Sequence, residues 1–198
     1  PPVATPEKIA QFTGNAPGMT GAKPARKIAE LLIAGSKSPD ETALALFAHL
    51  PRSLGGIGVP APLLDQALEI PEEFTRLVGS RHLRPALVWP QIHVALEYDA
   101  RDGNESSFQA EYLARKSRAY AGAGYELIEL SRSDIEDFES LRACFERIAR
   151  KLGKRRKPVN AKQNARQRKT YQQLFGVSTG PGTEVSELQE AGIAPKQG

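Results

Sequence analysis

Two acidic side chains, Glu97 and Asp99, lie two residues apart in the segment IHVALEYD. In an extended strand such side chains point to the same side, so the two carboxylates would lie close together. Neighbouring carboxylates repel each other unless a proton or a cation lies between them, and a hard divalent ion such as Mg²⁺ takes oxygen ligands of this kind. The spacing indicates a metal site, with a solvent-facing acidic stripe as the simpler alternative.

Positive charge is concentrated in a single segment. Residues 151–169 contain nine of the 27 Lys and Arg residues and no acid, so the remainder of the chain carries a net −5 although the whole chain carries +4. A block of this kind suits a phosphate backbone. The alternative is a solvated helix end and tail. On the first interpretation, the nucleic-acid-binding residues include Lys154, Arg155, Arg156 and Lys157.

The composition excludes several other classes of protein. Hydrophobic residues make up 40% and charged residues 25% of the 198 residues, which is ordinary for a globular protein. The chain has no apolar run of about 18 residues, the length that would indicate a membrane span. The single cysteine, Cys144, rules out a disulfide framework within one chain. We therefore expect a cytoplasmic protein with no membrane partner.

The sequence divides into four parts. Residues 1–22 are rich in Pro, Gly, Ala and Thr and predict a loose lead-in, and residues 23–157 predict the main domain. Residues 158–175 predict a basic helix, and 176–198 lack the apolar content for a core and predict a mobile tail. The start at Pro1 leads us to interpret the chain as a fragment or processed product, with a protein partner contacted through the missing N-terminal region.

A helix should present the first acid of interest, Glu41. Ser38 is a suitable N-cap, Pro39 fits the first helical position, and Glu41 follows Ser38 by three residues, which is the spacing of a capping box. The apolar residues that follow predict a helix that ends at Pro51. A capping-box glutamate folds back on the start of its helix and needs no metal, which is the simpler role for Glu41.

Strands should carry the acidic pair. The segments LRPALVWP and IHVALEYD predict two short strands joined at Pro90, and YELIEL predicts a third that returns beside the second through a helix over 106–121. A capping box at Ser133 and Glu136 and apolar residues three or four apart up to Leu152 predict one long helix. The expected fold class is α/β, a small mixed sheet flanked by helices on both faces.

The segments SPDETALALFAHLPRSLGGIGVPAP, LRPALVWPQIHVALEYD and RAYAGAGYELIELSRSDI resemble the restriction-endonuclease-like (PD-(D/E)xK) superfamily. More narrowly, they resemble its very-short-patch-repair-endonuclease-like branch and endonuclease-domain proteins of unknown function from gut actinobacteria. The likeness covers about residues 20–157. It implies a restriction-endonuclease-like core and an endonuclease-like domain over 23–157.

The resemblance also implies a set of site residues. The helix glutamate of the pattern matches Glu41, and its Glu-x-Asp matches Glu97 and Asp99, which would hold Mg²⁺ or Mn²⁺. Lys116 would stand in for the lysine that such nucleases place near the scissile phosphate. Arg115 and Arg118 on the same helix would contact the DNA backbone; the alternative is that all three cations face water.

The chain departs from the family pattern at Ala86, where an aspartate ligand is expected. The glycine expected after Glu-x-Asp is Ala100, and no histidine follows His93. The expected function is a metal-dependent phosphodiesterase domain acting on DNA, with an impaired active site and a weakly bound metal. The alternatives are a catalytically inactive nucleic-acid-binding or toxin–antitoxin-type regulatory module, and a plain protein-interaction domain.

Overall fold

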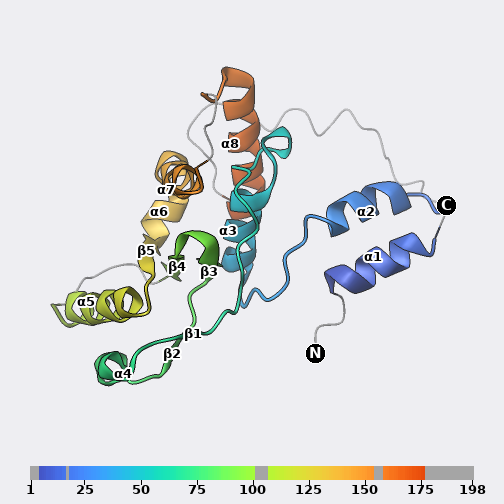
Figure 1. Cartoon of the computed structure of the whole chain (residues 1–198). Coiled ribbons are helices and arrows are strands. Elements are labelled where there is room, and N and C mark those ends of the chain that lie inside the picture. Colours follow the sequence, from blue (N-terminus) through green and yellow to red (C-terminus); the bar gives the residue numbers. More distant parts are fainter. Residues whose placement is uncertain (1–4, 17, 101–106, 154–157, 177–198) are drawn as a thin grey trace, which may run out of the picture.

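The computed structural model describes residues 5–16, 18–100, 107–153 and 158–176, with only the backbone at 107–109. These residues form a mixed α/β fold with eight α-helices and two small sheets (Figure 1). Within these ranges, none of the helices has both the length and the apolar character needed to cross a membrane. The presence of both helices and sheets confirms the α/β class predicted from the sequence.

The central sheet contains three strands, β3 (Leu87–Trp89), β4 (Val94–Asp99) and β5 (Glu126–Ser131), in the order β3-β4-β5. Strands β3 and β4 pair antiparallel, and β4 and β5 pair parallel. The predicted hairpin and returning third strand are confirmed. Helix α5 (Ser107–Gly122) makes the connection that a parallel pair requires.

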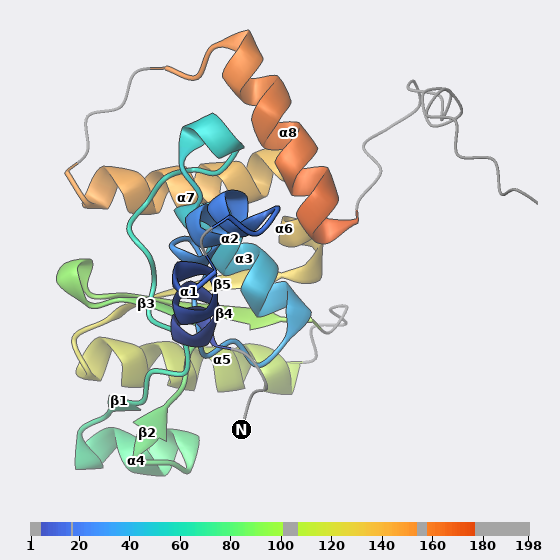
Figure 2. The same cartoon turned by 90° about the vertical axis from the view of Figure 1, so that its right-hand side faces the viewer.

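Helices cover both faces of this sheet. Figure 2 shows α5 on one side and α3 (Pro39–His49), α7 (Phe138–Lys151) and α8 (Ala161–Phe175) on the other. Ser38 caps α3 as predicted, because its hydroxyl accepts a hydrogen bond from the Glu41 amide. The predicted basic helix over 158–175 is α8, whose capping box pairs Asn160 with Gln163.

The long helix predicted after Ser133 is two helices, α6 (Arg132–Glu136) and α7. The chain leaves helical geometry at Asp137, whose carboxylate then caps α7 by accepting from the Ser140 amide. The capping box predicted for this region is also shifted, because Ser131 and Asp134 form it in place of Ser133 and Glu136. The apolar period alone predicts one helix, but the Asp137 cap within it starts a second helix.

The larger core lies between the sheet and α3, α7 and α8. Phe47 is fully buried at its centre and contacts four aromatic rings edge-on or nearly so, with ring centroids 6.0–6.4 Å apart. Trp89 is also fully buried and donates its indole N–H to the Pro60 carbonyl at 3.0 Å. A packing role for Trp89 beneath the sheet, as its sequence position suggests, therefore accounts for it.

A smaller core lies on the opposite face, beneath α5. Two-residue strands β1 (Leu68–Glu69) and β2 (His82–Leu83) pair antiparallel, with α4 (Glu72–Val78) between them in the chain. The residues buried here are Leu68, Ile70, Leu83, Val88, Ala95, Ala119 and Tyr120. Gly122 permits the close packing of α5 on α4, because a Cβ at this position would lie 2.3 Å from the Phe74 ring.

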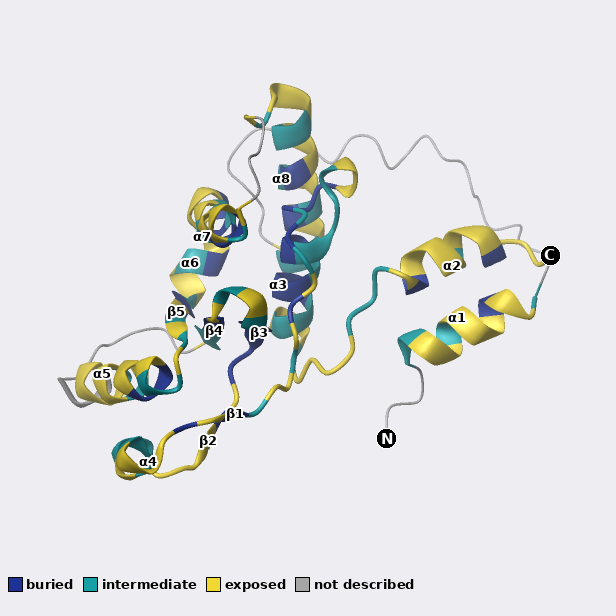
Figure 3. Ribbon diagram, viewed as in Figure 1, coloured by how far each residue is buried: buried dark blue, intermediate teal, exposed yellow. Residues whose placement is uncertain are grey.

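The N-terminal part differs from the loose lead-in expected over 1–22. Pro6–Gly14 form helix α1, capped by Thr5, and Ala22–Ala29 form α2. The two helices pack on each other to one side of the sheet (Figure 1), and Arg26 donates to the Thr13 carbonyl at 2.6 Å. Figure 3 shows that most of their surface is exposed. Thr5 followed by Pro6 was the sequence signal for this helix.

The glycine-rich segment after α3 is a bend, beginning with the 3-10 turn η1 (Arg52–Leu54). Gly55 has a φ of 85°, and a Cβ there would lie 2.1 Å from the Thr170 hydroxyl oxygen of α8. Gly56 is packed as tightly, because a Cβ would lie 2.0 Å from the Leu50 carbonyl oxygen. These glycines let the backbone pass between α3 and α8, which explains the motif without a phosphate-binding role.

Candidate functional site

Strand β4 presents Glu97 and Asp99 to the face of the sheet covered by α5. Ala95, two residues earlier on the same side, belongs to the small core beneath α5, whereas Leu96 belongs to the larger core. The predicted shared orientation of Glu97 and Asp99 follows from this alternation. The intervening Tyr98 points to the other face, where burial and the nearby carboxylate of Asp40 raise its pKa.

Glu97 is held by two side chains of α5. One of its carboxylate oxygens pairs with the Lys116 ammonium, and the other accepts a hydrogen bond from the Tyr120 hydroxyl. The Lys116 and Glu97 side chains are only 19% and 18% exposed. Burial, with the negative charge of Glu97, raises the pKa of Tyr120, so this phenol stays protonated and serves as a donor. The structure therefore brings together two of the predicted catalytic residues, Glu97 and Lys116.

A third acid, Glu129, faces this pair from the neighbouring strand. The parallel register aligns Glu97 with Glu129 and Asp99 with Ser131. Burial raises the pKa of Glu129, and the charges of Glu97 and Asp99 raise it further, while Lys116 acts in the opposite direction. On this face Lys116 pairs with Glu97 and also lowers the pKa of Glu129, so this cation acts on acids of both strands.

Ala86 lies directly before β3, at the edge of the larger core, with 9% of its surface exposed. The paired register of β3 on β4 ends at Leu87 and Leu96, so Ala86 lies just outside the ladder. Its methyl group packs in the larger core, whereas the Glu97 carboxylate lies on the face covered by α5. The methyl group of alanine offers no oxygen at this point.

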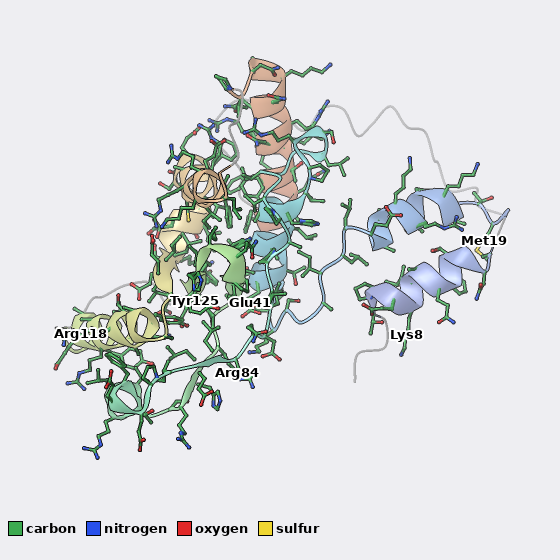
Figure 4. The ribbon with its side chains drawn as sticks, in the orientation of Figure 1. Lys8, Met19, Glu41, Arg84, Arg118 and Tyr125 are labelled. Atoms are coloured by element: carbon green, nitrogen blue, oxygen red, sulfur yellow. The ribbon has the colours of Figure 1, made fainter. Side chains whose placement is uncertain are left out.

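Glu41 has the capping role. Its carboxylate accepts a hydrogen bond from the Lys37 amide at 2.6 Å, and its own amide donates to Ser38 at 3.1 Å. The carboxylate thus folds back on the start of α3, one residue before the position that a strict capping box would use. Figure 4 shows Glu41 at this end of α3. The helix cap accounts for Glu41 without a metal ion.

The acidic side chains described around Glu97 do not make a complete metal centre. Among the described residues, no group of three or more His, Cys, Asp or Glu side chains lies close enough to hold an ion. Both oxygens of Glu97 are already engaged by Lys116 and Tyr120, and Ala86 supplies none. Since Mg²⁺ demands near-octahedral oxygen ligands, the side chains that the structure describes here do not by themselves fit that ion.

The cations predicted to contact nucleic acid are separate from Glu97. Arg115 and Arg118 are exposed on the outer side of α5, and Figure 4 shows Arg118 projecting from this helix. Arg115 pairs with Glu111 one turn earlier at 2.5 Å, an exposed ion pair of small energy. Lys154, Arg155, Arg156 and Lys157 lie outside the described residues.

Two of the residues around Glu97, Tyr120 and Glu129, were not among the predicted site residues. Tyr120 could be identified as buried from its place on α5, but its bond to Glu97 joins residues 23 positions apart. Glu129 stands in YELIEL at a position that alternates with buried Ile128 and Leu130, so only the pairing of β5 with β4 brings it to Glu97. Tyr112, earlier on the same helix as Tyr120, is 41% exposed.

Cys144 lines a shallow groove between β5 and α7, together with Ile128, Arg147 and Arg150. Burial raises the pKa of its thiol to about 11. A thiol with this pKa is protonated near neutral pH and is a poor nucleophile. This environment suits a packing role for Cys144 rather than a catalytic one.

Comparison with known proteins finds no matching family model, no matching curated protein and no matching solved structure.

Proposed function

We propose that this chain is an endonuclease-like domain acting on DNA whose metal-dependent phosphodiesterase site is impaired, leaving nucleic-acid binding as its main activity. The strand order supports a restriction-endonuclease-like core: an antiparallel pair, β3-β4, continued by a parallel strand, β5, after helix α5. The resemblance of the sequence segments over residues 20–157 supports the same assignment.

One observation carries the proposal. Glu97, the acid that the nuclease pattern uses as a metal ligand, is neutralised by Lys116 and hydrogen-bonded by Tyr120, and position 86, where the pattern has a further acid, is alanine. An acid on a half-buried sheet face must be paired, because removing an unpaired charge from water costs on the order of several kcal/mol. Lys116 supplies this compensation from the protein itself.

The chemistry of phosphodiester hydrolysis explains the expected loss of cleavage. A metal ion in such sites positions the attacking water, lowers its pKa and neutralises charge on the phosphate oxygens. An ammonium group can neutralise phosphate charge, but it carries no bound water to activate. The Lys116 ammonium is already paired with Glu97, so it cannot replace the metal ion, and hydrolysis requires the carboxylate ligand that Ala86 does not supply.

Two groups of cations are the proposed contacts to the DNA backbone. They comprise Arg115 and Arg118 on α5 and the segment containing Lys154, Arg155, Arg156 and Lys157. Contacts of this type position the backbone and carry no sequence information. The proposal thus predicts binding that weakens steeply with salt and has little sequence preference.

The test restores the missing ligand. Ala86→Asp is incubated with supercoiled plasmid and either Mg²⁺ or Mn²⁺, beside the unchanged protein and Ala86→Asn, a control of similar shape without the charge. We expect the aspartate variant to nick at a rate about 10²-fold above both others, the factor associated with correct placement of a reacting group. A melting curve for each variant verifies folding.

Two results would contradict the proposal. Efficient nicking by the unchanged protein would show that the site is not impaired. Absence of nicking by a folded Ala86→Asp variant, at high protein concentration and with both metals, would remove the nuclease assignment.

A further inference from the structure

Helix α8 is fixed to the larger core by one side only. Gln167 is fully buried and donates to the Gly56 carbonyl at 3.1 Å, and the Tyr171 hydroxyl donates to the Ile135 carbonyl at 2.6 Å. Thr170 donates to the Leu54 carbonyl at 2.9 Å. Because these contacts come from both the bend after α3 and helix α6, they fix the rotation of α8 about its axis.

This rotation turns a row of cations toward solvent. Lys162, Arg166 and Lys169 are all exposed, and their spacing of four and three residues puts them on one face of the helix. At about 1.5 Å per residue the row is about 10 Å long. Within the part of the chain that the structure describes, none of these three side chains forms an ion pair.

The charge of α8 is unusual in having no internal compensation. The segment AKQNARQRKTYQQLF contains four cations and no acid. The fourth, Arg168, is engaged: it pairs with Glu139 at 2.6 Å and lies over the Phe138 ring at 4.4 Å. Elsewhere in the fold exposed Arg and Lys side chains commonly have a carboxylate beside them, as Arg142 has Glu139 and Lys151 has Glu126.

We propose that the outer face of α8, formed by Lys162, Arg166 and Lys169, is a second surface that binds the phosphate backbone of duplex DNA. It is separate from the candidate site, because α8 and α5 cover opposite faces of the central sheet (Figure 2). The inference rests on the proposed function for the identity of the partner as DNA, but it requires no cleavage.

The structure favours nucleic acid over a membrane surface as the partner. A helix that binds a membrane inserts an apolar face into the lipid. The apolar side chains of α8 are turned inward: Tyr171 is fully buried, and Leu174 and Phe175 are packed against the larger core. What remains outside is a row of point charges with polar and small residues between them, which suits a phosphate backbone.

The experiment measures binding of a 20-base-pair duplex by fluorescence anisotropy over a range of salt concentrations. The variant is Lys162→Gln, Arg166→Gln and Lys169→Gln combined, since glutamine has a helix propensity close to that of Lys and Arg. The control removes the same three charges from α1 and α2 by Lys8→Gln, Lys23→Gln and Lys27→Gln. Each phosphate contact contributes about 0.9 to the slope of log K against log salt.

We expect the α8 variant to reduce this slope by about 2 to 3 and the affinity near 0.1 M salt by tenfold or more, with little change in the control. An unchanged α8 variant, or equal losses in both variants, would overturn the inference. Binding to vesicles rich in anionic lipid that depends on α8, without binding to DNA, would also overturn it. The plasmid assay with Ala86→Asp separately decides the proposed function, because it reports cleavage rather than affinity.

Discussion

The two faces of the central sheet differ in the side chains that they bury. The face beneath α3, α7 and α8 packs against aromatic side chains, and Phe47, Trp89 and Phe145 are fully buried there. The face beneath α5 begins with apolar Ala95 and Val88 and then changes to the charged group of Glu97, Glu129 and Lys116. One face supplies folding free energy, and the other holds charges that folding alone does not require.

The comparison shows how a charge can persist on a covered surface. Removing a carboxylate from water is costly, and the attraction of a partner offsets this cost only when the pair is also hydrogen-bonded. Glu97 meets that condition, because Lys116 and Tyr120 engage both of its oxygens. Replacing such a group with apolar residues is often neutral or stabilising, so the pair is weak evidence for a contribution to stability.

The largest expected effect is on the aromatic face. Phe47→Ala should lower the free energy of unfolding by about 3–5 kcal/mol, because it removes a buried ring and leaves a cavity among four others. Urea unfolding measures this, with Phe47→Leu as a milder control. A loss below about 1 kcal/mol would show that this face is not the main source of stability.

The aromatic face is also the part that the sequence predicts best. Ser38 and Pro39 mark the start of α3, and the apolar period from Ile135 to Leu152 predicts the helices α6 and α7, although not the break at Asp137. These signals are local, because capping and helical periodicity act over a few residues. Helix α4 has no such cap and was not predicted.

The charged face is predicted less completely. The spacing of Glu97 and Asp99 identifies their shared side, since alternation within a strand is local. The pairing of Glu97 with Lys116 and its alignment with Glu129 depend on how α5 and β5 return to β4, over 19 and 32 residues. Periodicity carries no information on such contacts, so only the resemblance to a nuclease pattern directed attention to Lys116.

A second prediction concerns the coupling of Glu97 and Lys116. Glu97→Gln or Lys116→Met alone should cost about 1–3 kcal/mol, because each leaves a partner charge partly buried and unpaired. The double variant should cost less than the two single costs combined, with a coupling free energy of about 1–3 kcal/mol.

The exposed pair Glu111–Arg115 on the same helix is the matched control. Its coupling, measured by the same urea unfolding of Glu111→Gln, Arg115→Gln and the double variant, should be only about 0.3–0.5 kcal/mol. Equal coupling in the two pairs would contradict the view that the α5 face covers a strong internal ion pair.

The smallest expected effect is the pH dependence from Glu129. Its pKa in the folded protein is raised above the ordinary 4.5, so the folded state binds more protons than the unfolded state between the two values. This group therefore lowers stability as pH rises through that window. Glu129→Gln should be as stable as the unchanged protein at pH near 4 and more stable at pH 8, by less than about 1 kcal/mol.

Urea unfolding of both proteins across this pH range measures the difference. A Glu129→Gln variant that is less stable than the unchanged protein at pH 8 would contradict the expectation. It would indicate that Lys116 stabilises the Glu129 carboxylate more than burial and its acidic neighbours disfavour it.

Under the proposed function, the central claim is that Glu97 belongs to a metal site that lacks one carboxylate. The most direct measurement is the plasmid-nicking rate of Ala86→Asp with and without Glu97→Gln. We predict nicking by the single variant and a loss of about 10²-fold or more when glutamine replaces Glu97, because a metal ligand would then be missing again. Nicking by Ala86→Asp that is unchanged by Glu97→Gln would contradict the claim.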